Sequence, residues 1–170
     1  MAASESKTAG GGSPRLVTIT RTIDAPRDLV FRMWTRPELL TRWYAPRRCQ
    51  LEVLNFDFRP RGSFRYRIVE PDGSGCLCSA IFTQIVAPGR IVYSLCFCDE
   101  EGRFVTAKSV GADAEWPDET TVTVTFVEHE QRTTMTLHQT VPESVAKRTG
   151  AYPSWIEMLD RLSEALSSAA

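Results

Sequence analysis

The five cysteines are the residues of this sequence with the most evident chemistry, because thiolates bind soft metals and enter redox reactions. Four of them form the pairs Cys76-Leu-Cys78 and Cys96-Phe-Cys98. In a strand, alternate side chains point to the same face, so each pair presents both thiols on one face. Structural zinc sites place about two to four residues between paired cysteines, whereas these pairs have one. We therefore predict buried free thiols and no metal site, with a metal or redox role as the alternative.

The positions of the two cysteine pairs relative to each other depend on strand register. If the dipeptide Pro88-Gly89 forms a two-residue turn between two strands, Phe82 lies opposite Leu95. The second cysteine pair then faces away from Cys78. A three-residue turn would instead bring Cys78 opposite Cys98. The sequence leaves this choice open.

Neither histidine completes a nucleophilic triad. His129 lies in a charged hairpin turn, and His138 alternates with threonines on the side of a strand opposite Met135 and Leu137. Both patterns predict solvent-exposed polar residues, and a ligand or base role is the alternative. The carboxylates cluster in polar loop segments, so a solvated loop is favoured over an acid–base pair. We predict no catalytic residue and no cofactor.

Length and composition are those of an ordinary globular domain. The chain has 170 residues, of which 42% are hydrophobic and 24% charged, enough to bury roughly two-thirds of the unfolded surface in one domain. Its net charge of −1 gives no general attraction to nucleic acids or anionic membranes. Arg65 and Arg67 interleave with Phe64 and Tyr66, which superficially resembles a platform for single-stranded nucleic acid. Inward aromatics and outward arginines on one strand are the simpler interpretation, and we expect no nucleic-acid partner.

The sequence predicts a cytoplasmic protein with reduced thiols. We expect no membrane insertion, because no apolar run reaches the length of a span, and the N-terminus has no hydrophobic segment of a secretory signal. An odd number of cysteines without export fits a reducing compartment. Residues 1–14 are small and polar and predict a disordered tail, followed by a single domain at residues 15–170. We expect a monomer or a weak homodimer.

Hydrophobic periodicity predicts a strand, two short helices, about six antiparallel strands and a long C-terminal helix. The expected strands cover residues 16–23, 51–58, 63–70, 76–86, 90–98, 121–127 and 133–141. Pro26 fits the first turn of one helix, and Thr35-Arg-Pro-Glu38 has the form of a capping box that starts a second. Residues 144–169 predict an amphipathic helix. Whether the polar residues 99–119 form a lid or a loose loop stays open.

This order of elements predicts an α+β fold in which a curved antiparallel sheet wraps the C-terminal helix. If the two short helices close one opening, a cavity between helix and sheet follows. We expect Trp43 to face a ligand there and Trp34 to pack in the core; a fully packed core is the alternative. The expected cavity wall is Trp43, Phe64, Tyr66, Phe82, Tyr93, Phe97, Met135, Trp155, Met158 and Leu159, with candidate polar contacts at Arg21, Arg59 and Gln139.

Three segments resemble motifs of a known family. DAPRDLVFRMWTRPELLTRW (residues 24–43) resembles the opening motif of the bacterial activator-of-heat-shock-protein-ATPase homologues, in the START/SRPBCC superfamily. DFRPRG (residues 57–62) resembles the next motif, where a second glycine is more usual than Ser63, and WIEMLDRL (residues 155–162) resembles the closing helix. The resemblance extends from about Leu16 to Leu166.

The resemblance implies a helix-grip fold, in which the curved sheet and the long helix enclose a hydrophobic cavity. Superfamily members include binders of lipids and small molecules, polyketide cyclases and aromatases, and eukaryotic co-chaperones, and the family motifs carry no catalytic signature. Our leading hypothesis is a stress-related, non-enzymatic binder of a small hydrophobic molecule that is lipid-, polyketide- or flavonoid-like. One alternative is a cyclase-, aromatase- or hydrolase-like enzyme. The other is a co-chaperone that stimulates a heat-shock-protein ATPase, although we expect no extra chaperone-binding domain of the eukaryotic kind.

Overall fold

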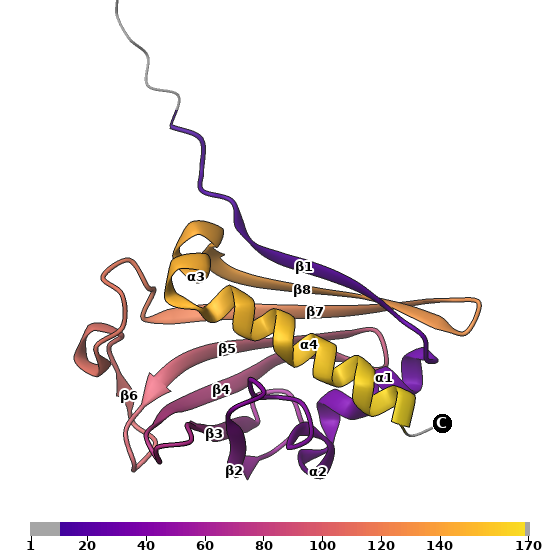
Figure 1. Ribbon diagram of the computed structural model, residues 1–170, viewed down its shortest axis with the longest axis horizontal. Coiled ribbons are helices and arrows are strands. Elements are labelled where there is room, and N and C mark those ends of the chain that lie inside the picture. Colours follow the sequence, from indigo (N-terminus) through magenta and orange to yellow (C-terminus); the bar gives the residue numbers. More distant parts are fainter. Residues whose placement is uncertain (1–10, 169–170) are drawn as a thin grey trace, which may run out of the picture.

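The computed structural model describes residues 11–168, which form one curved antiparallel sheet and four α-helices (Figure 1). The sheet order is β1-β8-β7-β5-β4-β3-β2, with β6 paired to the last two residues of β5. Its strands are β1 (Leu16–Ile23), β2 (Gln50–Phe56), β3 (Ser63–Val69), β4 (Gly75–Val86), β5 (Arg90–Cys98), β6 (Phe104–Val105), β7 (Glu119–His129) and β8 (Arg132–Pro142). The helices are α1 (Arg27–Thr35), α2 (Pro37–Leu40), α3 (Glu143–Thr149) and α4 (Ala151–Ser168), with a 3-10 turn η1 (Lys108–Val110).

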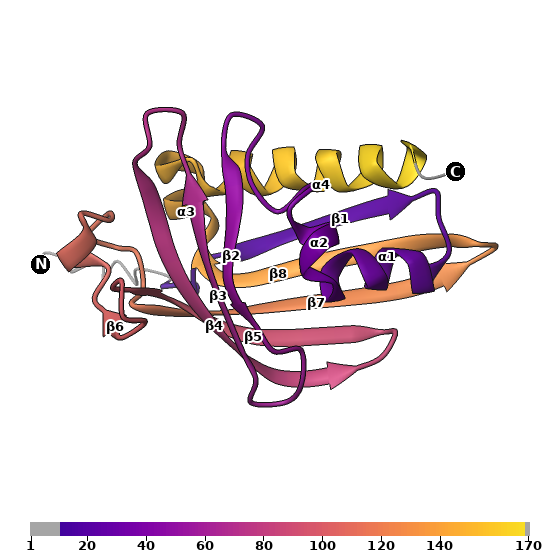
Figure 2. The same ribbon diagram turned by 90° about the horizontal axis from the view of Figure 1, so that it is seen from below.

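The helix α4 lies across the concave face of the sheet, which confirms the predicted α+β helix-grip fold (Figure 2). Its buried residues Trp155, Met158, Leu159 and Leu162 recur at helical spacing and so form one apolar stripe. The facing strands alternate buried and less buried residues, as β8 does at Met135 and Leu137. Helix and sheet therefore bury a common core. The expected single helix is interrupted at Gly150, whose φ of 86° ends α3 in the left-handed conformation.

The helices α1 and α2 close the end of the sheet that lies beside the C-terminal half of α4 (Figures 1 and 2). The capping box predicted for α2 is wrong. Arg36 is the N-cap residue and makes no side-chain cap, while the Thr35 hydroxyl donates to the carbonyl of Arg32, one turn earlier in α1. Thr35 is still the last residue of α1, so its side chain completes that helix and does not begin the next.

The pairing of β4 with β5 differs from both predicted registers. Val86 pairs with Arg90 across a three-residue connection, which alone would place Cys78 opposite Cys98. A β-bulge between Phe82 and Gln84 shifts the rest of the ladder by one residue, so that Phe82 lies opposite Tyr93. Cys78 consequently lies opposite Phe97, and the pair Cys96-Phe-Cys98 faces away from it.

The predicted disordered tail covers residues 1–14, and residues 1–10 lie outside the described part of the chain. Residues 11–14 are exposed and belong to no helix or strand. Within residues 11–168, no helix combines the length and the apolar character needed to cross a membrane.

Candidate ligand cavity

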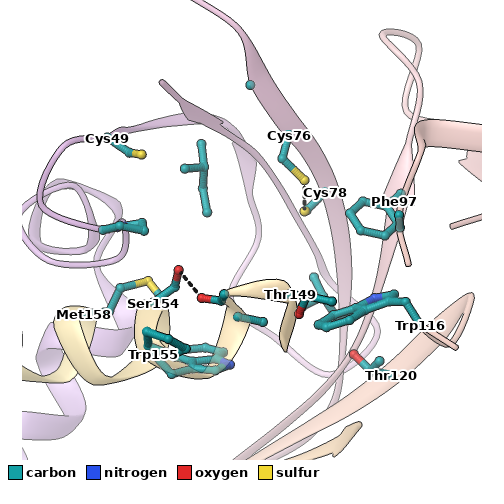
Figure 3. Close-up of a pocket in the computed structure, with 18 of the residues that line it drawn as sticks. Cys49, Cys76, Cys78, Phe97, Trp116, Thr120, Thr149, Ser154, Trp155 and Met158 are labelled. Carbon is teal, nitrogen blue, oxygen red and sulfur yellow. Dashed lines mark hydrogen bonds between the residues drawn. The ribbon is translucent and has the colours of Figure 1, made fainter. Parts of the chain in front are cut away.

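A cleft of about 1020 Å³ opens between the first two turns of α4, the strands β3–β5 and residues 111–118 (Figure 3). This volume lies at the upper end of the range of about 300–1,000 Å³ that small-molecule sites occupy. The lining is mainly apolar, with Ile68, Leu95, Phe97, Trp116 and Met158 among its residues. Because α1 and α2 close the other end of the sheet, the space between the strands and α4 opens to solvent at this end.

A buried polar network lies at the floor of the cleft. Trp155 Nε1 donates to Gln139 Oε1 at 2.9 Å, and Gln139 Nε2 donates to Thr120 Oγ1 at 3.1 Å. Gln139 is 2% exposed and all three residues line the cleft. The Thr120 oxygen accepts from Gln139, so its own O–H can be donated to an oxygen atom of a ligand. The network therefore offers one oriented hydrogen-bonding point within apolar surroundings.

Two buried phenols line the cleft beside this network. Tyr44 and Tyr66 are lining residues, and the Tyr44 hydroxyl lies 2.8 Å from that of Tyr93 in the core behind them. Burial raises the pKa of Tyr44 to about 12 and raises the pKa values of Tyr66 and Tyr93 well above the usual value. These hydroxyls stay protonated at neutral pH. They act as hydrogen-bond donors and acceptors and not as bases.

Residues 111–118 are one wall of the cleft and are held by specific contacts. The Arg148 guanidinium, at the end of α3, forms ion pairs with Asp113 at 2.8 Å and with Glu115. The Asp118 carboxylate accepts from the amide of Ala107 at 2.7 Å. Trp116 packs against the core from within this polar segment. The segment is thus an anchored wall and not a loose loop.

Thiol groups form part of the opposite wall. Cys49, Cys76 and Cys78 line the cleft, and all five cysteines are free. Cys96 also borders the cleft, but the strand register points its side chain to the other face of the sheet. The sulfur atoms of Cys76 and Cys78 are 3.5 Å apart (Figure 3). Among residues 11–168, no group of three or more His, Cys, Asp or Glu side chains is arranged to hold a metal ion.

Four of the ten residues expected to form the cavity wall line this cleft, and the other six lie in the packed core. Tyr66, Phe97, Trp155, Met158 and the polar Gln139 border it. The core residues behind it are Trp43, Phe64, Phe82, Tyr93, Met135 and Leu159, each at most 3% exposed.

Trp43, the residue expected to face a ligand, does not line the cleft. Its ring is fully buried, and its Nε1 donates to the carbonyl of Met33 at 3.0 Å. The ring also packs edge to face against Trp34, with the ring centroids 4.6 Å apart. Two of the three expected polar contacts also lie elsewhere. Arg21 pairs with Asp160, and the exposed Arg59 pairs with Asp57.

Several lining residues were not predicted from the sequence. Thr120, Tyr44 and the ion pair of Arg148 with Asp113 carry no local signal, because their neighbours come from distant parts of the chain. Trp116 did carry one, as a lone aromatic residue in a polar segment. Four carboxylates line the cleft, namely Glu70, Asp113, Asp118 and Glu157. Neither histidine lines the cleft, and the pKa of Asp113 is lowered by Arg148 and not raised by burial.

The family model described as "Activator of Hsp90 ATPase homolog 1-like protein" matches residues 24–167. The chain belongs to this family. Assignment to the Activator of Hsp90 ATPase homolog 1-like family confirms the resemblance seen in the sequence and is consistent with the START/SRPBCC superfamily. Its START-like fold supports ligand binding in general.

Solved structures of similar proteins have the same fold. A protein from Staphylococcus epidermidis is 27% identical, with 94% of this chain and 93% of that chain covered and a TM-score of 0.74. A protein from Arthrobacter aurescens is 25% identical, with 89% and 85% covered and a TM-score of 0.76. The AHSA1 protein from Silicibacter pomeroyi is 15% identical, with 91% and 99% covered and a TM-score of 0.71, a likeness of fold alone. No curated protein matches the sequence.

Proposed function

We propose that this protein binds a small, largely hydrophobic molecule in the cleft beside the start of α4. The observation that carries the proposal is a ligand-sized cleft with apolar walls and one buried polar network, Thr120–Gln139–Trp155, at its floor. A ligand of this kind gains from burial of its apolar surface, at roughly 25 cal/mol per Å². An oxygen atom that meets the Thr120 hydroxyl would fix its orientation.

Lipid-, polyketide- and flavonoid-like molecules combine an apolar body with oxygen atoms and are the ligand classes we propose. A thermal-shift screen against flavonoids, polyketides and fatty acids tests this. A ligand at 100 times its dissociation constant should stabilise the folded protein by about 2.7 kcal/mol. If none of these classes raises the melting temperature, the proposal is wrong.

A matched pair of variants locates the binding site. Ala112 lines the cleft, whereas Ala114 is exposed on the same segment and does not line it. Ala112→Phe should project a ring into the cleft and weaken binding of a screened ligand at least tenfold, while Ala114→Phe should leave binding unchanged. Equal binding by both variants would place the ligand elsewhere.

A stress-related role as a co-chaperone and a cyclase- or hydrolase-like activity are the alternative functions. The family description refers to activation of the Hsp90 ATPase, and this supports testing the purified protein for stimulation of that ATPase. Stimulation that survives Ala112→Phe would favour a docking surface over the cleft. Turnover of a polyketide substrate that Ala112→Phe abolishes would instead favour an enzyme.

A further inference from the structure

Two thiols face each other on the cleft wall formed by β4. Cys76 and Cys78 alternate along the strand and so point to the same face, with their sulfur atoms 3.5 Å apart (Figure 3). Cys76 is half-buried and Cys78 is 7% exposed, and both line the cleft. The pair is therefore reached from the cleft and shielded from bulk solvent.

The two thiols differ in protonation. Their sulfur atoms share a hydrogen bond in which either can be the donor. This contact lowers the pKa of Cys76, and together with burial it raises the pKa of Cys78 well above its usual value. Cys76, the less buried of the two, is accordingly the thiol that loses its proton more readily. A thiolate with a neighbouring thiol is the arrangement that attacks a soft electrophile and then completes a second bond.

The surroundings of the pair are apolar on both neighbouring strands. Ile68 of β3 lies opposite Cys76, and Tyr66 of β3 and Phe97 of β5 lie on either side of Cys78. The second cysteine pair has no such setting. Cys96 lies on the opposite face of the sheet, next to Ser79, and its thiol donates to the Ser79 carbonyl.

The number of thiolate ligands available decides which kind of atom the cysteine pair can bind. Two zinc–thiolate bonds of about 2.3 Å at a tetrahedral angle hold their sulfurs about 3.8 Å apart, close to the separation here, but zinc needs four ligands. No third His, Cys, Asp or Glu side chain of residues 11–168 joins the pair as a metal-binding group. A trivalent arsenic atom with one organic substituent needs only two thiolates. Its smaller bond angle also suits a shorter sulfur–sulfur distance.

We propose that Cys76 and Cys78 form a dithiol site that captures a monosubstituted trivalent arsenical. An arsenical R–As=O and the two thiols give a cyclic dithioarsenite, R–As(S)₂, and one water. Two As–S bonds form, the As=O bond is lost, the two thiol protons leave in the water, and the arsenic stays trivalent. The substituent R packs against Tyr66 and Phe97. This site does not depend on the proposed binding of an oxygenated apolar ligand.

Phenylarsine oxide tests the site on the full-length reduced protein. The wild type should bind one equivalent and lose two titratable thiols, and intact mass should show one phenylarsenic unit. Cys76→Ser and Cys78→Ser should each lower the affinity about 100-fold, because a single thiol loses the intramolecular second bond. Thermal melting checks that each variant folds. Because Cys76 is half-buried, Cys76→Ser carries the test if Cys78→Ser is unstable.

The double variant Cys96→Ser/Cys98→Ser is the matched control and should bind as the wild type does. Undiminished binding by Cys76→Ser, or loss of binding in the control, would overturn the proposal. Absence of any thiol loss in the wild type would overturn it as well. If phenylarsine oxide fails while flavonoids or fatty acids still raise the melting temperature, only the dithiol site is refuted and the proposed function stands.

Discussion

Buried polar side chains of this protein have two different tasks. Gln139 satisfies both ends of its amide with Thr120 and Trp155 and thereby fixes a polar point in the cleft floor. Thr133 instead ties β8 to the start of α1, because its hydroxyl donates to the carbonyl of Ala25 at 2.7 Å. Only the first of these contacts borders the cleft. Burial of a polar group therefore does not by itself identify a binding residue here.

Trp43 shows the same distinction among aromatic residues. Trp43→Ala should lower the free energy of unfolding by about 3–5 kcal/mol, because a fully buried ring is lost from the core. Affinity for a cleft ligand should change little once the variant is folded. Urea denaturation and ligand titration at low temperature measure the two effects. A large loss of affinity with unchanged stability would restore Trp43 as a ligand contact.

At the scale of elements, the wall formed by residues 111–118 depends on α3. Arg148→Met should speed hydrogen exchange of the amides in this wall, because the ion pairs with Asp113 and Glu115 are lost. The melting temperature should fall only slightly. Arg32→Met is the control, since Arg32 is exposed on α1, far from the wall in sequence. Unchanged exchange in Arg148→Met would show that other contacts hold the wall.

Acid should release the same wall. Arg148 lowers the pKa of Asp113 to about 2, below the usual value of about 3.9. A lowered folded-state pKa means that the link is complete above about pH 4 and is lost as the pH falls through about 2. The indole N–H signal of Trp116 in NMR spectra should therefore shift with a midpoint near pH 2. In Arg148→Met the midpoint should rise toward the usual aspartate value, and an identical midpoint in both proteins would contradict the assignment.

At the scale of the whole molecule, one continuous core joins every large element. The cluster of buried residues includes Val17 of β1, Trp34 of α1, Tyr66 of β3 and Leu162 of α4. Such a core predicts cooperative unfolding of a single domain. Urea transitions followed by tryptophan fluorescence and by far-UV circular dichroism should coincide. Two separated transitions would instead indicate that part of the structure unfolds independently.

The sequence determined the elements and their order, because alternation at period two and apolar spacing at helical period are properties of neighbouring residues. These patterns predict the seven longer strands and the α4 stripe but not the two-residue β6. The family motifs are instead recognised by their resemblance to known sequences. Boundaries that depend on one local contact were less certain. The Thr35 hydroxyl bonds backward into α1, and Gly150 divides the final helix.

Tertiary structure alone decided where the cleft lies and which residues line it. A single bulge near Phe82 set the register that places Cys78 opposite Phe97, and turn length could not reveal it. The packing of α1 and α2 buried Trp43 and left the opening beside Trp155. Both outcomes depend on contacts between residues far apart in the chain. Local patterns identify which side chains are apolar but not which of them meet each other and which border a space.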